Sequence, residues 1–267
     1  MWQFFSGILK ILVFPVTSFL EYLGTLAIMF GEACYYLPYA LPFRKSSKWK
    51  YILGQIAKIG FESLPIVFLM AFLLGVILAL QAAKQLERFG ATIYVADLVA
   101  ISLTREIGPI LISIIIAGRT GSAIASEIGT MLVTEEITAL RAMGIKPAKI
   151  LVMPKTVALF FGLPGLVLLG DFIGIAAGFF IGCFMLDISF WDYYNQTIKI
   201  LSMAHIWAGI KKCFVFAIVI SMVGAYRGFS VTGGAEGVGK ATTSAVVDSI
   251  ILIIAINSLF TLISYYQ

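Results

Sequence analysis

Residues 118–154 read GRTGSAIASEIGTMLVTEEITALRAMGIKPAKILVMP and form the one long polar interval between strongly apolar parts of the chain. Apolar residues recur here at helical spacing, as at Ile124 and Ile128, which predicts helix. Thr134, followed by two glutamates, is typical of a helix start, and Gly144 is typical of a helix end. We therefore expect a short amphipathic helix between two membrane spans. It is either a solvated loop helix or a helix that docks in a groove on a cytoplasmic partner.

The composition determines the class of protein. Of 267 residues, 60% are hydrophobic and 12% are charged, whereas a soluble domain carries about a quarter charged residues. We expect an all-α polytopic membrane protein with a single membrane domain over residues 1–267. The net charge of +5 lies in short loops, which favours cytoplasmic loop charge over a nucleic-acid surface. The three cysteines are far apart in apolar runs, so no metal or paired-thiol spacing is present.

The N-terminal segment, residues 1–43, has a mixed pattern. The polar residues of positions 2–42 fall on one face of a helix, and Pro15 would kink that helix. This pattern predicts an amphipathic helix lying in the membrane interface. A sixth membrane span over the same residues remains the alternative.

Five apolar stretches follow, and each is long enough to cross the bilayer. The basic cluster at residues 44–50 indicates that the first stretch starts in the cytoplasm. The second stretch then returns residues 118–154 to the cytoplasm. The predicted spans are 59–83, 98–117, 156–186, 207–226 and 245–264. In the third, glycines recur every four residues and form a small-residue face suited to close helix packing, including packing between two copies: Gly170, Gly174, Gly178 and Gly182.

Four charged residues inside these spans are the most informative for function, because burying an unpaired charge in hydrocarbon costs several kcal/mol. Glu106 and Lys212 are expected at similar depth in the outer half of two different spans, with Arg105 beside Glu106 and Asp171 near the middle of the third span. The pair either lines a wet cavity or forms a salt bridge that only fixes helix packing.

A catalytic role is not supported by the sequence. Gly234–Lys240 matches the spacing of a phosphate-binding loop, but Ala241 replaces the hydroxyl residue that would hold magnesium, and no β-strand pattern precedes it. We expect this segment to be a flexible cytoplasmic hairpin. The chain is therefore predicted to be neither an enzyme nor a cofactor-binding protein.

Two stretches carry a family resemblance. TREIGPILISIIIAGRTGSAIASEIGTMLVTEEITALRAMGI, which starts at Thr104, and GVGKATTSAVV, which starts at Gly237, resemble the MlaE-type (YrbE-type) permeases of lipid-transporting ABC systems. The resemblance implies a homodimer in the bacterial inner membrane with an interfacial N-terminal helix and five spans. It implies a coupling helix that docks on a separate ATPase, an MCE-domain lipid-shuttle protein as a further partner, in some systems a STAS-domain protein, and phospholipids as substrates.

The resemblance also assigns roles to residues. Glu106 matches the acid of the family's R-E-[LI]-G-P motif, and Lys212 matches a lysine at the start of the fourth span; both are associated with a lipid cavity between the two copies. With Arg105 and Asp171 they make up the expected cavity residues. The coupling region, 127–147, is expected to act through a set that begins at the E-I-G-x-M motif: Glu127, Gly129, Met131, Glu135, Glu136, Leu140 and Met143.

Two other functions remain open from the sequence. One is a proton-coupled secondary transporter of an amphiphile, in which Glu106, Asp171 and Lys212 would bind protons. The other is a membrane scaffold that transports nothing.

Overall fold

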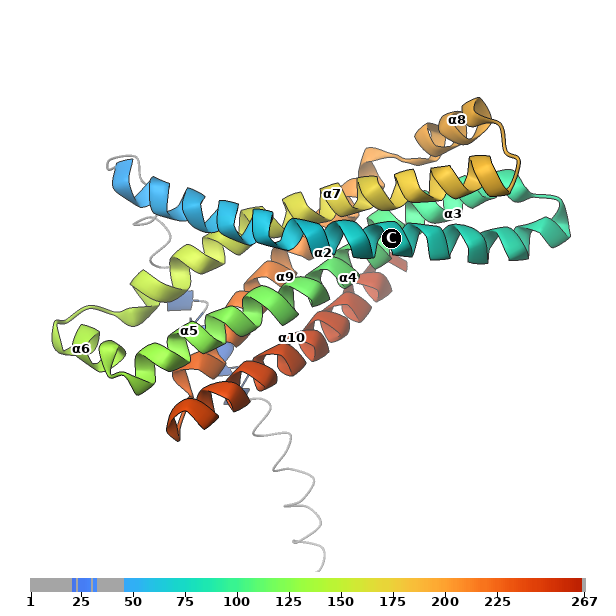
Figure 1. The fold of residues 1–267 in the computed structure, drawn as a ribbon. Coiled ribbons are helices and arrows are strands. Elements are labelled where there is room, and N and C mark those ends of the chain that lie inside the picture. The colour runs from blue at the N-terminus through green and yellow to red at the C-terminus, as the bar shows by residue number, and fades with distance from the viewer. Residues whose placement is uncertain (1–20, 23, 30, 33–45, 266–267) are drawn as a thin grey trace, which may run out of the picture.

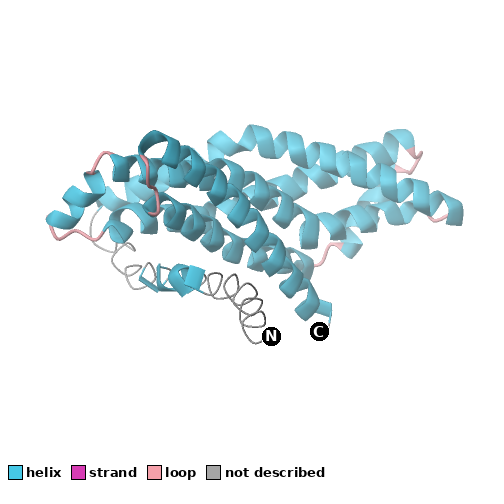
Figure 2. Cartoon of the chain, turned by 90° about the horizontal axis from the view of Figure 1, so that it is seen from below, coloured by secondary structure: helices cyan, strands magenta, loops and turns pink. Residues whose placement is uncertain are grey.

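The computed structural model of the chain describes residues 21–22, 24–29, 31–32 and 46–265. Every element in these ranges is helical, and short loops join the helices (Figures 1 and 2). Five of the helical stretches are long and apolar enough to cross a membrane, which confirms the predicted all-α fold with five spans. The interfacial helix expected at residues 1–43, like the alternative sixth span there, lies mostly outside the described residues.

The spans are longer than the apolar cores predicted from the sequence. The first, Ile52–Phe89, has 38 residues, whereas a hydrocarbon core about 30 Å thick needs only about 20 helical residues. It therefore projects well beyond the hydrocarbon. Its helices are α2 (Ser46–Leu86) and η1 (Glu87–Phe89). The second span, Thr92–Val133, is a chain of helical pieces: η2 (Thr92–Tyr94), α3 (Val95–Ser102), η3 (Leu103–Ile107), α4 (Gly108–Ile116), η4 (Ala117–Gly121) and α5 (Ser122–Val133).

The other three spans are simpler. The third comprises the π-helical turn η5 (Ala148–Val152) and α7 (Met153–Met185), the fourth is α9 (Met203–Phe229), and the fifth lies in α10 (Gly234–Tyr265). Two short helices lie between spans: α6 (Glu136–Ala142) and α8 (Phe190–Ile200).

Glycine allows α2 and α7 to pack backbone against backbone. The two helices run side by side (Figure 1). A Cβ atom at Gly75 would overlap the carbonyl oxygen of Gly174 and lie 2.9 Å from its Cα. No side chain separates the helices at this point, so the crossing depends on glycine at both positions.

The glycine stripe of α7 is used inside one copy of the chain. Gly170 and Gly174 lie against side chains of the second span, namely Ile112 and Leu103, and Gly182 lies against the ring of Tyr193. This stripe is therefore not available as the packing face for a second copy, contrary to one expectation from the sequence. The small residues indicated a close contact correctly but could not identify the partner helix.

α9 is the central helix of the bundle. It contacts α5, α7 and α10, and it buries Phe216 and Ile220 completely. A Cβ atom at Gly228 would lie 2.7 Å from the Cβ of Ile128 in α5. This close packing fixes α9 along its length and therefore fixes Lys212, which it carries.

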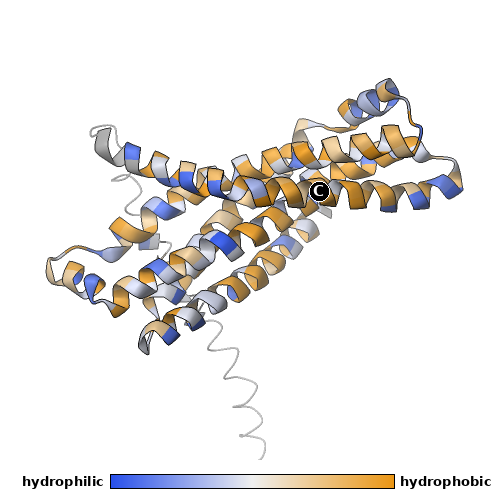
Figure 3. Cartoon of the chain, viewed as in Figure 1, coloured by the Kyte–Doolittle hydropathy of each residue, from blue (hydrophilic) through white to orange (hydrophobic). Residues whose placement is uncertain are grey.

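The bundle has two distinct ends. α6 and the start of α2 lie at one end, here named the α6 end, and α8 lies at the other, here named the α8 end (Figure 1). Hydrophobic residues cover the middle of the long helices, and hydrophilic residues gather toward the ends (Figure 3). Such a distribution is expected of helices whose middle lies in hydrocarbon.

α8 was not predicted as a helix. The aromatic residues after Asp187 form this helix, which buries Tyr193 against α7. A signal was present, because Asp192, Gln196 and Lys199 recur at helical spacing.

Two local predictions need correction. Gly234–Lys240 is not a flexible hairpin: it forms the first turns of α10, and Glu236 Oε1 lies 2.7 Å from Lys240 Nζ one turn later. The turn is made just before, where Gly233 has a φ of +86°. The expected cap of α6 is also absent, because the Thr134 hydroxyl lies beside the Thr130 carbonyl and the Glu136 carboxylate, while Glu135 adopts a left-handed φ of +59°.

Candidate functional site

Glu106 and Lys212 come together from the second and fourth spans. Lys212 Nζ donates to Glu106 Oε2 at 2.5 Å. The lysine side chain is 2% exposed and the glutamate side chain is 27% exposed. The buried cation is therefore neutralised by its partner, while the carboxylate remains accessible from one side.

The backbone beside Glu106 supplies a second acceptor for Lys212. η3 is a π-helical turn, in which the Gly108 N–H donates to the carbonyl of Leu103, five residues earlier. Pro109 has no N–H, so it cannot donate to the carbonyl of Arg105, four residues before it. Lys212 Nζ donates to that carbonyl at 3.1 Å. The Arg105 carbonyl, which Pro109 leaves without a backbone donor, thus holds Lys212 in place. π-Helical turns are frequent at functional sites.

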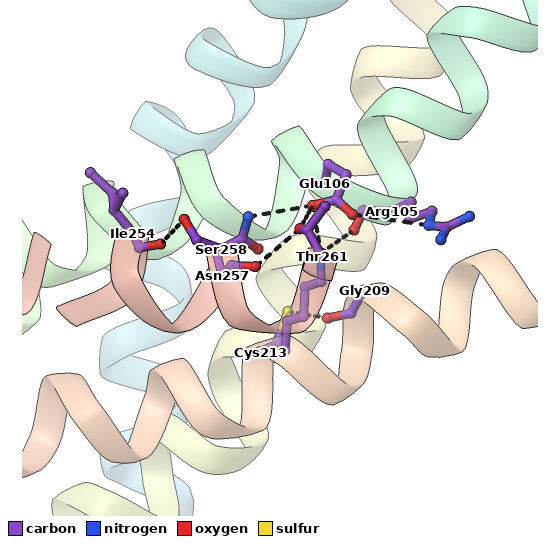
Figure 4. Close-up of polar contacts among 9 residues, drawn as sticks. Arg105, Glu106, Gly209, Cys213, Ile254, Asn257, Ser258 and Thr261 are labelled. Carbon is purple, nitrogen blue, oxygen red and sulfur yellow. Dashed lines mark hydrogen bonds and ion pairs between the residues drawn. The ribbon is translucent and has the colours of Figure 1, made fainter. Parts of the chain in front are cut away.

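Two side chains of α10 complete this group. Thr261 Oγ1 donates to Glu106 Oε2 at 3.0 Å, and Asn257 Nδ2 donates to the same oxygen at 3.4 Å. Figure 4 shows both side chains reaching toward Glu106 from one face of α10. Sequence reasoning missed them, although their spacing of one helical turn in an apolar stretch was a usable signal. We name Glu106, Lys212, Asn257, Thr261 and the Arg105 carbonyl the Glu106 site.

Arg105 and Asp171 have different relations to this site. Arg105 Nε lies 3.9 Å from Glu106 Oε1, and its guanidinium extends away from the carboxylate (Figure 4). Asp171 is buried in α7 behind the site, where a Cβ atom on Gly108 would overlap Asp171 Oδ1. Within the described part of the chain, no ion pair joins Asp171 to Lys212 or Arg105. The structure therefore brings three of the four predicted cavity residues together and places the fourth behind them.

The Glu106 site has a defined chemical capacity. It gathers a carboxylate, an ammonium, an amide and a hydroxyl between the apolar second, fourth and fifth spans, with the Arg105 side chain beside them. Such a group can bind a charged or polar ligand moiety, while the surrounding apolar helix faces contact hydrocarbon.

The residues predicted to couple the chain to an ATPase fall into two groups. The first group, on α5, contacts the rest of the chain and consists of Glu127, Gly129 and Met131. Glu127 forms an ion pair with Lys155, and Gly129 lies against Val231. The others lie at or near α6, with Leu140 packed inward and an exposed set available for contact: Glu135, Glu136 and Met143.

Comparison with known proteins identifies the family. The family described as Permease MlaE matches residues 52–263. A probable ABC transporter permease protein of Rickettsia prowazekii is 44% identical over 210 residues, which cover 79% of this chain and 81% of that protein. A probable ABC transporter permease protein of Synechocystis is 37% identical over 205 residues, 77% of this chain and 78% of that protein.

A plant protein is also similar. The chloroplastic protein TRIGALACTOSYLDIACYLGLYCEROL 1 of Arabidopsis thaliana is 33% identical over 203 residues, which cover 76% of this chain and 58% of that protein. The region that matches the family contains the whole Glu106 site, α6 and nearly all of the five apolar spans. This multi-pass membrane protein therefore belongs to the MlaE family of permeases.

Proposed function

We propose that this permease is the membrane subunit of an ABC transporter that moves phospholipids or related lipids between the bacterial inner membrane and the outer envelope, driven by a separate ATPase subunit. The Glu106 site carries the proposal, because it is an accessible charged group held within apolar spans. The name of the Arabidopsis relative is that of a galactolipid, which also favours a lipid as the transported class.

In this proposal, the two parts of a lipid contact different parts of the chain. The headgroup binds at the Glu106 site, where Arg105 provides a partly exposed guanidinium for a phosphate. The acyl chains lie on apolar faces of the spans. Asp171 contacts no lipid and instead packs against Gly108.

A homodimer would enclose the site. Only 11% of the apolar window of the fifth span is buried within one copy, so a second copy can cover α10 and close a cavity beside Thr261. The basic cluster at residues 44–50 supports a cytoplasmic α6 end. The ATPase would then bind at α6, a STAS-domain protein would join on the same side, and an MCE-domain lipid-shuttle protein would meet the α8 end.

The ATPase contact provides the test of this function. In proteoliposomes that contain the ATPase partner, the double variant Glu135→Lys with Glu136→Lys is expected to lower ATP-driven lipid transport about tenfold. Reversing two charges on a docking surface is expected to cost about 1.4 kcal/mol or more, which is a factor of ten. Both glutamates are exposed, so membrane insertion and thermal stability should stay unchanged.

Two controls make the result specific. Glu87→Lys reverses an exposed acid toward the α8 end and should transport at the wild-type rate. Wild-type transport by the double variant would show that α6 is not the docking element. Adding a proton ionophore to ATP-fed proteoliposomes tests the secondary-transport alternative: transport should continue, and its loss while ATP remains would refute an ATP-driven mechanism.

A further inference from the structure

A second charged group lies toward the α6 end, away from the Glu106 site. It lines a cleft of about 80 Å³ between α2, the η4–α5 region and the start of α7. The charged residues of this cleft come from all three elements: Lys58, Glu62, Arg119, Glu127 and Lys155. We name it the α2–α7 cleft.

The charges of the cleft do not cancel. Arg119 Nη2 lies 3.1 Å from Glu62 Oε2, and Lys155 Nζ lies 2.5 Å from Glu127 Oε2. These two ion pairs use both acids. Within the described part of the chain, Lys58 forms no ion pair or hydrogen bond. The cleft therefore keeps one positive charge without a counter-charge, which attracts an anion.

The cleft also has free hydrogen-bonding capacity. The Arg119 side chain is 39% exposed, and a guanidinium has five N–H donors, of which the Glu62 contact uses one. Ser63 lines the same cleft with a hydroxyl that has no hydrogen-bond partner. An oxyanion with several acceptor oxygens, such as a phosphate group, fits these donors better than a carboxylate does.

The position of the cleft indicates an amphiphile rather than a soluble anion. Lys58 and Glu62 lie one turn apart on α2, and the next turn on the same face is Ile66, which is exposed and apolar. The residues that follow form the apolar core of the first span. A ligand with its phosphate at Lys58 would therefore place its acyl chains along α2 in the hydrocarbon.

The cleft is separate from the Glu106 site. Arg119 follows Glu106 by 13 residues on the same span, which corresponds to a rise of about 20 Å. Glu106 contacts α9 and α10, whereas Arg119 contacts α2. A lipid held at Arg119 would thus lie near the opposite membrane surface and against different helices.

We propose that the α2–α7 cleft binds the phosphate of an anionic phospholipid from the leaflet at the α6 end. Basic pockets between spans on the cytoplasmic side commonly bind anionic headgroups. The bound lipid is a resident one that bridges α2, η4 and α7, and it is distinct from the lipid that is transported. This site goes beyond the transport function proposed above and does not depend on the ATPase.

The test measures lipid cross-linking. The permease is placed in phosphatidylcholine nanodiscs that contain a small fraction of phosphatidylglycerol carrying a photoreactive acyl chain. Wild-type protein should be labelled on peptides of α2 and α7. Lys58→Glu should reduce this labelling at least fivefold, whereas Lys50→Glu, which changes an exposed lysine of the same helix outside the cleft, should leave it unchanged.

Further experiments distinguish an anionic lipid headgroup from a neutral headgroup and from free phosphate. Photoreactive phosphatidylcholine should label these peptides much less than phosphatidylglycerol; equal labelling would overturn the preference for an anionic headgroup. Millimolar inorganic phosphate should not displace the lipid, and full displacement would show a soluble-anion site instead. Equal labelling of Lys58→Glu and wild type would overturn the site itself. Lipid transport by the same variants in proteoliposomes with the ATPase partner reports separately on the Glu106 site, so failure of one proposal is distinguishable from failure of the other.

Discussion

Replacing Lys212 by methionine is expected to lower ATP-driven lipid transport on the order of a hundredfold. Methionine preserves the length of the side chain but removes the cation that neutralises Glu106. Breaking a buried ion pair by removing one partner costs roughly 3–5 kcal/mol. Arg105 compensates only in part, because its Nε lies 3.9 Å from the other carboxylate oxygen. Transport of a fluorescent phospholipid by proteoliposomes, with the ATPase partner present, measures the effect.

Lys211 offers a matched control for this variant. It is the adjacent residue on α9, but it is exposed rather than buried, so Lys211→Met changes the net charge equally and should transport normally. The exchange Glu106→Lys with Lys212→Glu should recover part of the activity, since opposite charges again face each other. Wild-type transport by Lys212→Met would refute a role for the pair in lipid binding.

The same variants decide between a binding site and a packing contact. If the pair binds lipid, the Lys212→Met protein that remains folded should lose copurified phospholipid, in addition to any fall in its melting temperature. If the pair only fixes α9 against η3, the melting temperature should fall and the retained protein should still bind phospholipid. The accessible side of Glu106 and the hydrogen bonds from α10 favour the first result.

Replacing Gly75 by valine is expected to abolish the folded permease. A Cβ atom there would overlap the carbonyl oxygen of Gly174, and the other near atoms are also backbone. No side chain can move aside, so α2 and α7 would have to separate along their crossing. Overpacking commonly costs about 1–3 kcal/mol. An overlap with backbone atoms is expected to cost at least the upper value of this range. Fluorescence-detected size-exclusion chromatography in detergent measures the folded fraction.

Gly60 provides the comparison on the same helix. A Cβ atom at Gly60 would meet nothing within 4 Å, so Gly60→Val should elute and melt like the wild type. Gly75→Ala should give an intermediate loss. A sharp wild-type elution peak and an unchanged melting temperature for Gly75→Val would mean that the α2–α7 crossing is not as close as the structure shows.

Hydropathy predicted the spans because a bilayer requires an unbroken apolar length whatever the rest of the fold is. The pairing of Glu106 with Lys212 was predictable for a related reason: an unpaired charge in hydrocarbon is costly, so two opposite charges at one depth are expected to meet. The same reasoning also placed Asp171 with them, and the structure puts this residue on α7 against Gly108. Its depth was readable from the sequence, but the helix face on which it lies was not.

The features that the sequence did not reveal have separate causes. Asn257 and Thr261 carry no charge, so reasoning from the cost of an unpaired charge in hydrocarbon does not single them out. The helix α8 lies outside the apolar stretches, where no membrane constrains the pattern. The partner of the α7 glycines could not be inferred, because small residues permit close approach to any helix.

The wide turn at Leu103–Ile107 sets the angular phase of the rest of the second span. A turn that holds one extra residue rotates every later side chain by about 100° relative to an uninterrupted helix. Deleting one residue there would leave the hydropathy of the span nearly unchanged. It would nevertheless swing Ile112 away from Gly170, which it now meets. The shortened span would keep almost the same composition, but Glu106 and Ile112 could not both face their present partners.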